Sequence, residues 1–372
     1  MFHSIYNGKK VLVTGHTGFK GSWLSLWLHE LGAKVIGFAQ NPYTSQDIFV
    51  RTNLSEKLID RRGDINNFNE LLGVFDEFKP DFVFHLAAQP IVRVAYDLPL
   101  QTFATNAMGT ANVLQAIQQT DSVQGAVIIT TDKVYQNTNS LWGYRECDPL
   151  GGHDPYSASK ACAEIIIESF RKSFFSSKTG DFRKGVASAR AGNVIGGGDW
   201  QKDRLIPDCI RALCTNHPII VRNPKAIRPW QHVLEVIGAY LLLGERLLAS
   251  QELKKESIYA EAWNFGPSPD SILTVEDLVA KIIQNWKSGE WKSEVSTNDI
   301  KHEAEILLLD ISKSRFKLGW HPVLNIDECM ELTIEWYKCA MENPTLNLYD
   351  VSRDQIKKYC TIAHGQNAQW LN

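Results

Sequence analysis

VLVTGHTGFKG, residues 11–21, places a glycine-rich loop between an apolar run and an amphipathic segment. Residues 11–13 predict a short buried strand, and apolar side chains from Trp23 to Leu31 recur at helical spacing until Gly32. Glycines let a backbone turn tightly and approach a pyrophosphate, while a helix start offers free N–H groups and a positive dipole. The spacing is GxxGxxG rather than GxGxxG, but its place between a strand and a helix favours a dinucleotide-binding loop over an ordinary glycine turn.

Further apolar runs alternate with helical patterns through the first half of the chain. Strands that are apolar on both faces and alternate with helices indicate a parallel sheet covered on both sides. The predicted fold class is therefore α/β, a Rossmann-type doubly wound parallel sheet with a smaller, discontinuous C-terminal substrate lobe. The predicted strands are 34–38, 81–87, 126–130 and 186–189, and the predicted helices are 67–78, 98–119 and 156–174.

The pattern changes after Arg190. The second half predicts a helix at 208–214, a strand at 219–221, a long apolar helix at 230–248 that packs back on the first sheet, and a helix at 326–341. We expect an NAD-binding Rossmann domain of residues 1–190 plus roughly 229–265. A nucleotide-sugar-binding lobe of residues 191–228 and 266–372 would close over the strand ends.

Composition excludes several classes of function. The chain has 372 residues, 44% hydrophobic and 22% charged, with a net charge of −3, so no basic field favours nucleic acid or an anionic membrane. No apolar run approaches the ~20 residues of a membrane span, and the start lacks a signal core, so we expect a cytoplasmic protein. The seven cysteines show no CxxC pairing and are expected to be free thiols, and we expect no metal because His16, His232 and His302 lack ligand spacing.

The second predicted strand bears on the choice of cofactor. It ends Ala39-Gln40-Asn41, without the acidic residue that ordinarily holds the adenosine ribose hydroxyls, and without an adjoining arginine for a 2′-phosphate. We expect NAD rather than NADP. Asp64 and Ile65 follow a glycine, and Asp64 either reaches the adenine amine or caps the next helix.

Two pairs of side chains carry the predicted chemistry. Tyr156 and Lys160 stand at i and i+4 on one helix face, where the ammonium would lower the pKa of the phenol and make it a base near neutral pH. Thr131-Asp132-Lys133 follows the strand at 126–130. An acid and an amine there either cap the strand on the surface, where such pairs contribute little, or belong to a site.

In these and later segments the chain resembles the extended short-chain dehydrogenase/reductase superfamily, and within it the nucleotide-sugar enzymes. The first half matches in Thr14-Gly15-x-x-Gly18-x-x-Gly21, His85-Leu86-Ala87-Ala88-Gln89, Asn106, Thr131, and Tyr156 with Lys160. The second half matches in Arg190-Ala-Gly-Asn193-Val-Ile-Gly196, Arg204-Leu-Ile-Pro207, Ile227-Arg228-x-Trp230 and Trp263-Asn264-Phe265-Gly266.

Within the superfamily, Asp132-Lys133 distinguishes the dehydratase pattern from the patterns of epimerases and reductases. In that superfamily, 4-epimerases and plain reductases usually carry small residues after the strand-end Ser or Thr, whereas 4,6-dehydratases carry Asp, commonly followed by Glu. Dehydratases must also remove the C5 proton and expel the C6 hydroxyl. Here Lys133 stands in place of that Glu, and in this the chain resembles the CDP-glucose 4,6-dehydratases. The same resemblance extends to the loop at 15–21, Gly196-Gly-Gly-Asp-Trp200 and His302-Glu303-Ala304.

The resemblance implies a hydro-lyase that recycles NAD, with Thr131, Asp132, Lys133, Tyr156 and Lys160 as catalytic residues. Tyr156, helped by Lys160 and Thr131, would take the C4 hydroxyl proton. Lys133 would take the C5 proton and Asp132 would protonate the departing C6 hydroxyl, although which of these two is acid and which is base stays open. Another sugar-nucleotide dehydratase, a 4-epimerase or a non-catalytic NAD-binding module are the alternatives.

The resemblance also implies the binding residues and a homodimer built on the helices at 98–119 and 156–174. The small-molecule substrate would be CDP-glucose, and the product would feed deoxysugars of bacterial surface polysaccharide, such as lipopolysaccharide O-antigen. The expected NAD-binding residues are Gly15, Thr17, Gly18, Phe19, Lys20, Gly21, Asp64, Ile65, Leu86, Ala87, Ala88, Asn106, Thr130, Tyr156 and Lys160. The expected substrate-binding residues are Gln89, Arg93, Asn193, Arg204, Leu205, Arg228 and His302.

Overall fold

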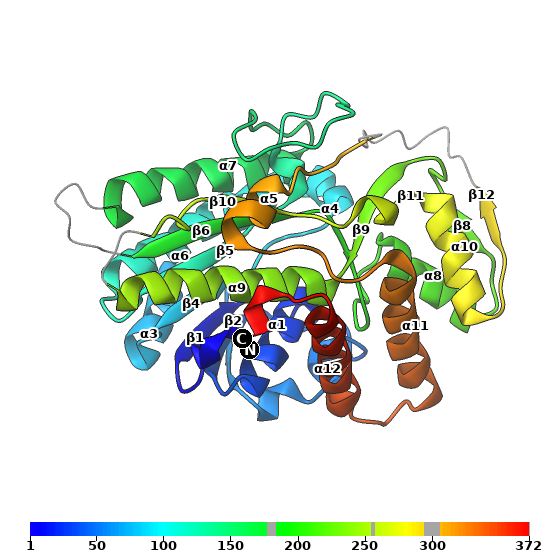
Figure 1. Ribbon diagram of the computed structural model, residues 1–372, viewed down its shortest axis with the longest axis horizontal. Helices are drawn as coiled ribbons and strands as arrows, with labels where there is room; N and C mark the ends of the chain where they lie inside the picture. Colours follow the sequence, from blue (N-terminus) through cyan, green and yellow to red (C-terminus); the bar gives the residue numbers. More distant parts are fainter. Residues whose placement is uncertain (177–183, 254–256, 294–305, 372) are drawn as a thin grey trace.

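A seven-stranded parallel sheet forms the centre of the protein (Figure 1). The structure is a computed structural model that describes residues 1–176, 184–253, 257–293 and 306–371. The strand order β10-β6-β5-β4-β1-β2-β3 is that of a doubly wound sheet, which confirms the predicted fold class. The strands are β1 (Lys10–Thr14), β2 (Lys34–Ala39), β3 (Ile59–Arg62), β4 (Phe82–His85), β5 (Gly125–Ile129), β6 (Gly185–Ala191) and β10 (Ala262–Phe265).

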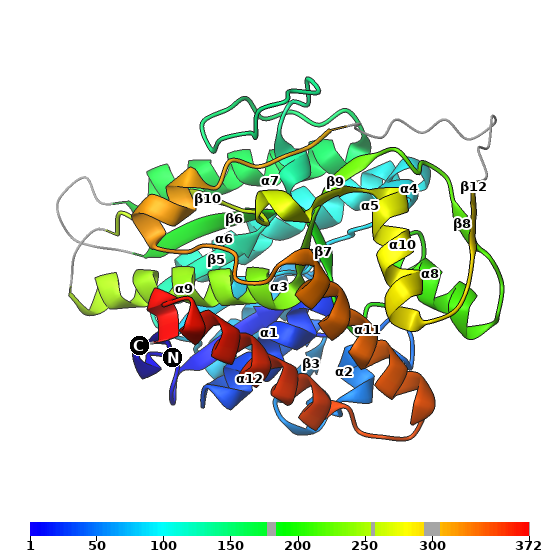
Figure 2. The same cartoon turned by 45° about the vertical axis from the view of Figure 1, so that its right-hand side comes forward.

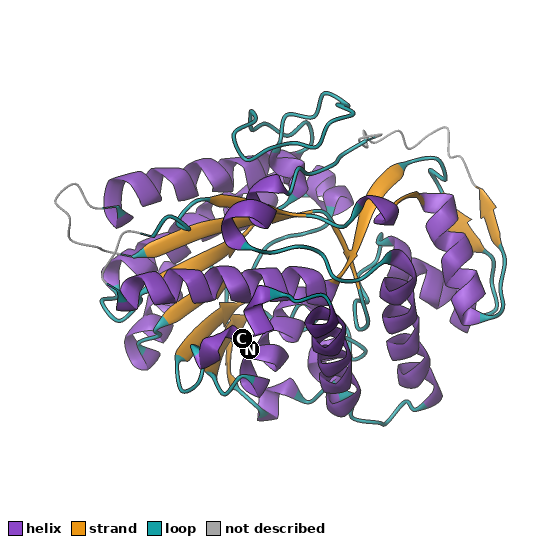
Figure 3. Cartoon of the chain, in the orientation of Figure 1, coloured by secondary structure: helices purple, strands orange, loops and turns teal. Residues whose placement is uncertain are grey.

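Alternate side chains of each strand enter two separate cores, because successive residues of a strand point to opposite faces. Val11 and Val13 lie in the core that includes α1 (Phe19–Glu30) and α9 (Val233–Glu252). Leu12 lies in the core on the other face, with α3 (Phe68–Phe78), α6 (Gly109–Gln119) and α7 (Pro155–Phe170). Figure 3 shows helices on both sides of the sheet. The continuous apolar runs in the sequence reflect this burial on both faces.

Two edge strands were not predicted. β3 reads Ile-Asp-Arg-Arg and is mostly exposed, so it has no apolar run, and its strand conformation comes from pairing with β2. β10 extends the opposite edge by pairing with β6. The predicted helix at 98–119 is divided into α5 (Pro99–Phe103), the π-turn η3 (Ala104–Met108) and α6, and α7 ends in a second π-turn, η5 (Arg171–Phe175).

A second group of elements lies beyond the carboxyl ends of the strands (Figure 2). The predicted helix at 230–248 is wrong at its start: residues up to His232 form β9 (Ile227–His232), which pairs with β7 (Asn193–Ile195) and β11 (Ile272–Thr274). The predicted helix at 208–214 begins earlier, as α8 (Leu205–Cys214). The group also holds β8 (Ile219–Val221), paired with β12 (Trp291–Ser293), and the helices α10 (Val275–Trp286) and α11 (Ile326–Glu342).

The end of the chain returns to the first half. The unpredicted helix α12 (Tyr349–Gly365) packs against α1, although the predicted lobe grouped residues 266–372 together. The division into a cofactor domain and a substrate lobe stays a prediction. The short helical segments are η1 (Phe2–Ser4), α2 (Ile48–Arg51), η2 (Leu54–Glu56), α4 (Val92–Asp97), η4 (Asp132–Val134), η6 (Pro269–Ser271), η7 (Ser314–Leu318) and η8 (Gln369–Leu371).

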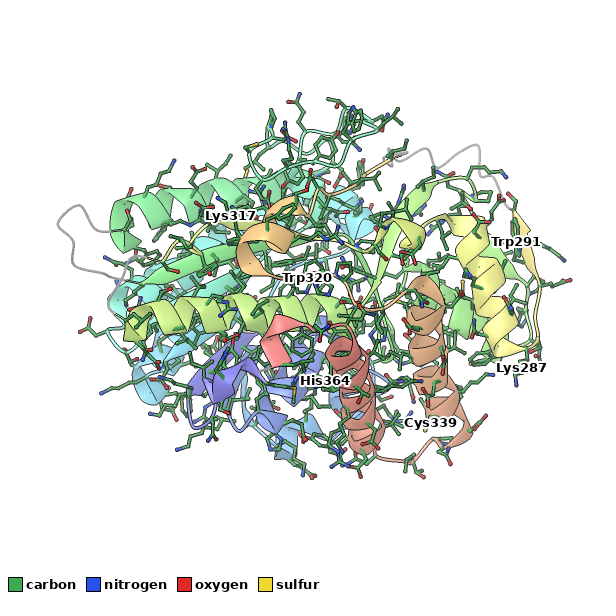
Figure 4. All side chains as sticks on the ribbon, in the orientation of Figure 1. Lys287, Trp291, Lys317, Trp320, Cys339 and His364 are labelled. Atoms are coloured by element: carbon green, nitrogen blue, oxygen red, sulfur yellow. The ribbon has the colours of Figure 1, made fainter. Side chains whose placement is uncertain are left out.

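A strap of residues 319–325 leads past α9 to α11. Its Trp320 packs edge-on against Phe265 at a centroid distance of 5.1 Å and lies beside α9 in Figure 4. The buried Glu235 of α9 holds the strap, because its Oε1 accepts hydrogen bonds from the backbone N–H groups of Val323 at 2.7 Å and Leu324 at 2.5 Å. Its Oε2 accepts one from the Tyr359 hydroxyl of α12 at 3.0 Å.

The described residues contain neither a membrane-spanning helix nor a metal-binding cluster. Within residues 1–176, 184–253, 257–293 and 306–371, no helix has the length and apolar character to cross a bilayer. The same part of the chain contains no group of three or more His, Cys, Asp or Glu side chains placed to hold a metal ion.

Candidate active site

The site lies where the chain order of the sheet reverses. β1 has β4 on one side and β2 on the other, so the connections leave in opposite directions and open a crevice at the carboxyl ends of these strands. The glycine loop after β1, the turn after β5 and the start of α7 all meet at this crevice.

The loop after β1 has the geometry of a dinucleotide loop. Gly15 has a φ of +75°, and a β-carbon there would lie 2.7 Å from the Ala87 backbone nitrogen. A β-carbon on Gly21 would lie 2.0 Å from the Gly15 carbonyl oxygen. Only glycine fits either position. Gly18 precedes α1 and is exposed, so the first N–H groups of the helix are open to an anion.

A cavity of about 490 Å³ continues this loop past the ends of β2 and β3, lined by Gln40, Asn41, Arg62, Gly63 and Asp64. Gln40 Nε2 donates a hydrogen bond of 3.0 Å to Asp64 Oδ2. The side chain that caps α3 is Asn67, which removes the helix-cap alternative for Asp64. Together the loop and the cavity fit the pyrophosphate and adenosine of a dinucleotide.

Arg62 corrects one part of the sequence analysis. No arginine was expected beside the adenosine, but β3, which was not predicted, brings Arg62 to the cavity wall. Its guanidinium donates to Asp60 Oδ2 at 2.7 Å and to the Gln40 carbonyl at 3.0 Å. These two partners occupy much of its hydrogen-bonding capacity.

Tyr156 and Lys160 lie on α7 with their side chains buried. Burial raises the pKa of Tyr156 to about 12, and a hydrogen bond with Thr131 opposes this only in part. Burial also lowers the pKa of Lys160 to about 8, against the favourable charge of Glu164. Lys160 Nζ donates to the Ile129 carbonyl at 3.2 Å. The structure therefore does not show the expected lowering of the phenol's pKa.

Asp132 lies in the turn η4, 3% exposed, and does not face bulk solvent. Its Oδ1 accepts a hydrogen bond of 2.9 Å from Thr131 Oγ1, and its Oδ2 is buried without a partner among the described residues. Burial raises the pKa of this carboxyl, and the nearby Lys133 and Arg228 oppose that effect. A protonated Asp132 beside Tyr156 is suited to give a proton to a leaving group.

Cationic side chains surround the same crevice. Burial, together with Lys160 and Arg204, lowers the pKa of Lys20 to about 7. Arg228 is 8% exposed and lies near Asp132. Arg93 lies 3.7 Å from Asp203 in the loop before α8.

The predicted substrate residues beyond β6 come from two elements. Arg204 precedes α8, where its Nη1 donates to Asp199 Oδ2 at 2.7 Å. Leu205 begins α8, and Asn193 begins β7, opposite Trp230 of β9.

The glycine loop that carries Asp199 is held by aromatic side chains from two helices. Trp23 Nε1 of α1 donates to the Gly197 carbonyl at 3.0 Å, and the Tyr337 hydroxyl of α11 donates to the Asp199 carbonyl at 2.5 Å. A β-carbon at Gly197 would lie 2.1 Å from the indole of Trp336.

Several predicted binding residues are occupied by protein contacts. Asn106 is fully buried and bonds Gln89 N at 2.8 Å, Gln89 O at 3.0 Å and Ser159 Oγ at 2.9 Å, so it positions the loop after β4. The Gln89 side chain bonds Ile91 and Thr102. Thr130 donates to Glu164 at 2.5 Å. His302 lies outside the described residues.

The remaining predicted cofactor residues lie in or next to the loops after β1, β3 and β4. Leu86 and Ala87 follow β4, where their N–H groups donate to the Thr14 carbonyl at 3.0 Å and the Thr14 hydroxyl at 3.4 Å. Thr17 donates to the Gln40 carbonyl at 3.0 Å, which links the glycine loop to the end of β2. Ile65, Phe19 and Ala88 border these segments in the sequence.

Comparison with known proteins shows the family of the chain. Residues 12–333 match the family model described as GDP-mannose 4,6 dehydratase. The chain is 45% identical over 358 residues to CDP-glucose 4,6-dehydratase of Salmonella typhimurium, covering 96% of this chain and 97% of that protein. The chain belongs to the sugar-nucleotide 4,6-dehydratase family. This confirms the resemblance drawn from the sequence.

Solved structures show the same fold as this 4,6-dehydratase. A dTDP-glucose 4,6-dehydratase from Bacillus anthracis in complex with NAD has a TM-score of 0.72 at 20% identity, covering 90% of this chain and 98% of that one. An epimerase from Methanothermobacter thermautotrophicus has a TM-score of 0.75 at 23% identity, covering 95% and 96%.

The sequence analysis of this 4,6-dehydratase missed Glu164, Arg190 and Asp199 as contributors to the site. Arg190 and Asp199 were noted only as parts of motifs. Glu164 carries a usable signal, because it stands one turn after Lys160 on the same helix face. Its partner Arg190 lies on another strand, and that pairing has no local signature.

Proposed function

We propose that the protein dehydrates CDP-D-glucose to CDP-4-dehydro-6-deoxy-D-glucose with NAD as a recycled cofactor. The observation that carries the proposal is Asp132, a buried carboxyl with one unpartnered oxygen beside Thr131 and Tyr156. An epimerase moves a hydride at one carbon and has no use for a second buried proton donor. The near full-length similarity to the Salmonella typhimurium CDP-glucose 4,6-dehydratase supports the choice of CDP-glucose.

The glycine loop, the N-terminus of α1 and the cavity at Gln40 and Asp64 would hold NAD. The chemistry that NAD supplies when bound is reversible hydride transfer, from C4 of the sugar at the outset and to C6 at the end. The first N–H groups of α1, which follow Gly18, would receive the pyrophosphate, and Asp64 would accept from the adenine amine. The Bacillus anthracis dehydratase in complex with NAD supports this placement.

Tyr156 would remove the proton of the C4 hydroxyl. A pKa of about 12 keeps the Tyr156 phenol protonated at neutral pH. A base form would require Lys160 to act on the phenol more strongly than it does while bonded to the Ile129 carbonyl. Thr131, which bonds both Tyr156 and Asp132, would orient the hydroxyl.

Asp132 and Lys133 would carry out the loss of water. A 4-ketone acidifies the C5 proton, and Lys133 would take that proton. Asp132 would give its proton to the C6 hydroxyl, the C6–O bond would break, and water would leave. Lys133 would then return its proton to C5. The net change is the loss of one water molecule. The proton that Tyr156 took from the C4 hydroxyl replaces the one that Asp132 gave to the leaving water, so all three side chains return to their starting states.

Arginines would hold the substrate pyrophosphate. Arg204 is fixed by Asp199, and Arg228 is 8% exposed beside the catalytic turn. The planar fork of arginine suits phosphate because it donates two parallel hydrogen bonds. Asn193, Leu205 and Arg93 would complete the lining of this pocket, and His302 is also proposed from its sequence motif.

Incubation with NAD and each of CDP-, UDP-, dTDP- and GDP-linked glucose or mannose tests the proposal. A 4-keto-6-deoxy product gives an absorbance in alkali that an epimerised product does not. We expect the strongest signal with CDP-glucose. If only another nucleotide sugar gave the absorbance, CDP-glucose would be the wrong substrate. If a 4-epimer formed without a keto product, the proposed dehydration would be wrong.

A homodimer through α5, α6 and α7 is also proposed. These helices pack together, and large apolar side chains are exposed on them: Leu100 at 84%, Met108 at 59% and Ile165 at 58%. Such a patch on a soluble surface marks an interaction site, and a second copy would cover it. Light scattering of the Leu100→Glu variant should show a monomer where the parent protein shows a dimer.

We further propose that the protein acts in a reducing compartment such as the cytoplasm and supplies deoxysugars for bacterial surface polysaccharide. The seven cysteines are all free, which supports a reducing environment. We also propose the division into an NAD-binding domain and a nucleotide-sugar lobe, supported by the separation of the seven-stranded sheet from the two smaller sheets β11-β9-β7 and β12-β8.

A further inference from the structure

A buried ion pair lies directly behind the catalytic residues. Glu164 of α7 is 3% exposed, and its Oε2 accepts from Arg190 Nη2 of β6 at 2.8 Å and from Ser188 Oγ at 2.8 Å. Its Oε1 accepts from Thr130 Oγ1 at 2.5 Å. Every one of these donors favours the ionised carboxylate, which explains why its pKa is lowered in spite of full burial.

Arg190 carries the network to the other end of the catalytic turn. Its Nη1 donates to the Tyr135 hydroxyl at 2.8 Å, and its guanidinium lies 5.0 Å from the centre of the Tyr135 ring. The Tyr135 hydroxyl donates in turn to Asn264 Oδ1 at 2.7 Å. Arg190 is 4% exposed.

These contacts hold both ends of one short segment. Thr130 immediately precedes residues 131–133 and Tyr135 follows them closely, so the pair fixes the segment that carries Thr131, Asp132 and Lys133. Glu164 also belongs to α7, one turn beyond Lys160. One ion pair therefore joins the helix of the hydride-transfer residues to the turn of the water-loss residues.

Glu164 also acts on Lys160 through its charge. Burial disfavours the Lys160 ammonium, and Glu164 opposes that effect. The other titratable groups near Lys160 are Lys20 of α1, His85 of β4 and Tyr156 of its own helix. Lys20 repels the ammonium when charged, and His85 stays neutral because burial lowers its pKa to about 3. Glu164 is the anionic group of this set.

We propose that Glu164 and Arg190 are positioning residues that fix the turn of residues 131–133 against α7 and place a negative charge one helical turn from Lys160. This inference rests on the proposed dehydratase function for its kinetic consequences. It assigns no contact with substrate or cofactor to either residue. Its two parts, the charge on Lys160 and the position of the turn, predict different responses to substitution.

Glu164→Gln tests the charge. The variant keeps the shape of the side chain, and Lys160 should lose its proton at a pH lower by about one unit, so the alkaline limb of kcat/KM should move down by the same amount. Ser188→Ala is the matched control, because it removes a hydrogen bond to the same carboxylate without changing its charge. Ser188→Ala should lower the stability of the protein and leave the alkaline limb of kcat/KM at the same pH.

A measurement without substrate separates this inference from the proposed function. Acetylation of the Lys160 amine by acetic anhydride over a pH series, read by peptide mass spectrometry, reports the protonation of Lys160 in a protein of any activity. Equal acetylation profiles for the parent protein and Glu164→Gln would overturn the charge part. The double variant Glu164→Gln/Arg190→Met avoids an unpaired buried guanidinium and should show the same shift if the single variant fails to fold.

Tyr135→Phe tests the positioning. It leaves the ion pair intact and cuts the link from Arg190 to the turn, so the acetylation profile should stay unchanged. Water loss should slow by at least about tenfold while C4 oxidation continues, and NADH absorbance should accumulate during turnover. If C4 oxidation and water loss slowed equally, or if neither slowed, the proposed positioning of the turn at residues 131–133 by Arg190 would be wrong.

Discussion

Thr131 donates its hydroxyl proton to Asp132 Oδ1 at 2.9 Å and leaves Asp132 Oδ2 buried, with no partner in the part of the chain that the structure describes. Burial raises the pKa of this carboxyl, and the charges of Lys133 and Arg228 oppose that effect without cancelling it. The free oxygen is then the one that can hold and release a proton.

Asp132→Asn removes that proton with little change in shape. If Asp132 is the acid for the C6 hydroxyl, water loss should slow by about 10²- to 10⁴-fold while C4 oxidation persists. NADH absorbance should build up in the presence of CDP-glucose. Parent-like formation of the keto product, followed by its absorbance in alkali, would contradict the acid role.

Lys133→Met should also stop water loss, but at the preceding proton transfer. In D₂O, Asp132→Asn should still exchange the C5 hydrogen of the oxidised sugar, since its base is intact, and Lys133→Met should not. Mass spectrometry of the recovered sugar distinguishes the two. Exchange lost in Asp132→Asn and kept in Lys133→Met would reverse the two roles.

Gln40→Asp should sharpen the choice of cofactor. A carboxylate at the end of β2 can accept hydrogen bonds from the ribose hydroxyls and would repel a 2′-phosphate. We expect NADP to bind at least about tenfold more weakly and NAD to bind as well as before or better. Titration calorimetry with both cofactors measures this. Gln40→Asn is the uncharged control and should leave the ratio of the two affinities nearly unchanged.

Glu235 predicts a dependence of stability on pH. Burial raises its pKa in the folded protein from 4.5 to about 7. The folded state then binds more protons than the unfolded state between these values, so this group's contribution is present below pH 4.5 and is lost as the pH rises through 7. The loss amounts to roughly 3 kcal/mol.

Glu235→Gln removes this loss. The amide keeps an oxygen for the N–H groups of Val323 and Leu324, and its NH₂ can donate to the Tyr359 hydroxyl. Urea unfolding at pH 6 and pH 8.5 should show that the variant gains stability relative to the parent protein as the pH rises. A constant difference between the two proteins would show that Glu235 does not titrate in this range.

The central sheet and the candidate catalytic residues can both be picked out from the sequence because both have local signatures. Strands β1, β2, β4, β5 and β6 are apolar on both faces, and Tyr156 with Lys160 is a helical spacing. β3 was missed because its charged residues take strand conformation only by pairing with β2. The start of α9 was misplaced because the apolar residues of β9 run directly into the helix, and only pairing across the sheet ends the strand at His232.

The contacts of the site were harder to predict than its residues. Asn106 matched a family position, but its partners, Gln89 and Ser159, come from other elements. The high pKa of Tyr156 depends on burial and on the actual position of Lys160 Nζ at the Ile129 carbonyl. Arg62 lines the cavity because it belongs to β3, a strand that has no apolar pattern in the sequence. Such facts depend on the packing of distant segments.

The bracing of Gly197 limits how the enzyme could be re-engineered for other sugars. Trp23, Trp336 and Tyr337 enclose the loop on which Arg204 depends, and any larger residue at 197 would collide with an indole. Directed evolution that randomised this loop would mostly yield proteins that misfold, however well the new side chains suited a ligand. A library confined to Arg93, Leu205 and neighbouring wall positions would sample new specificities while the frame beneath them stayed rigid.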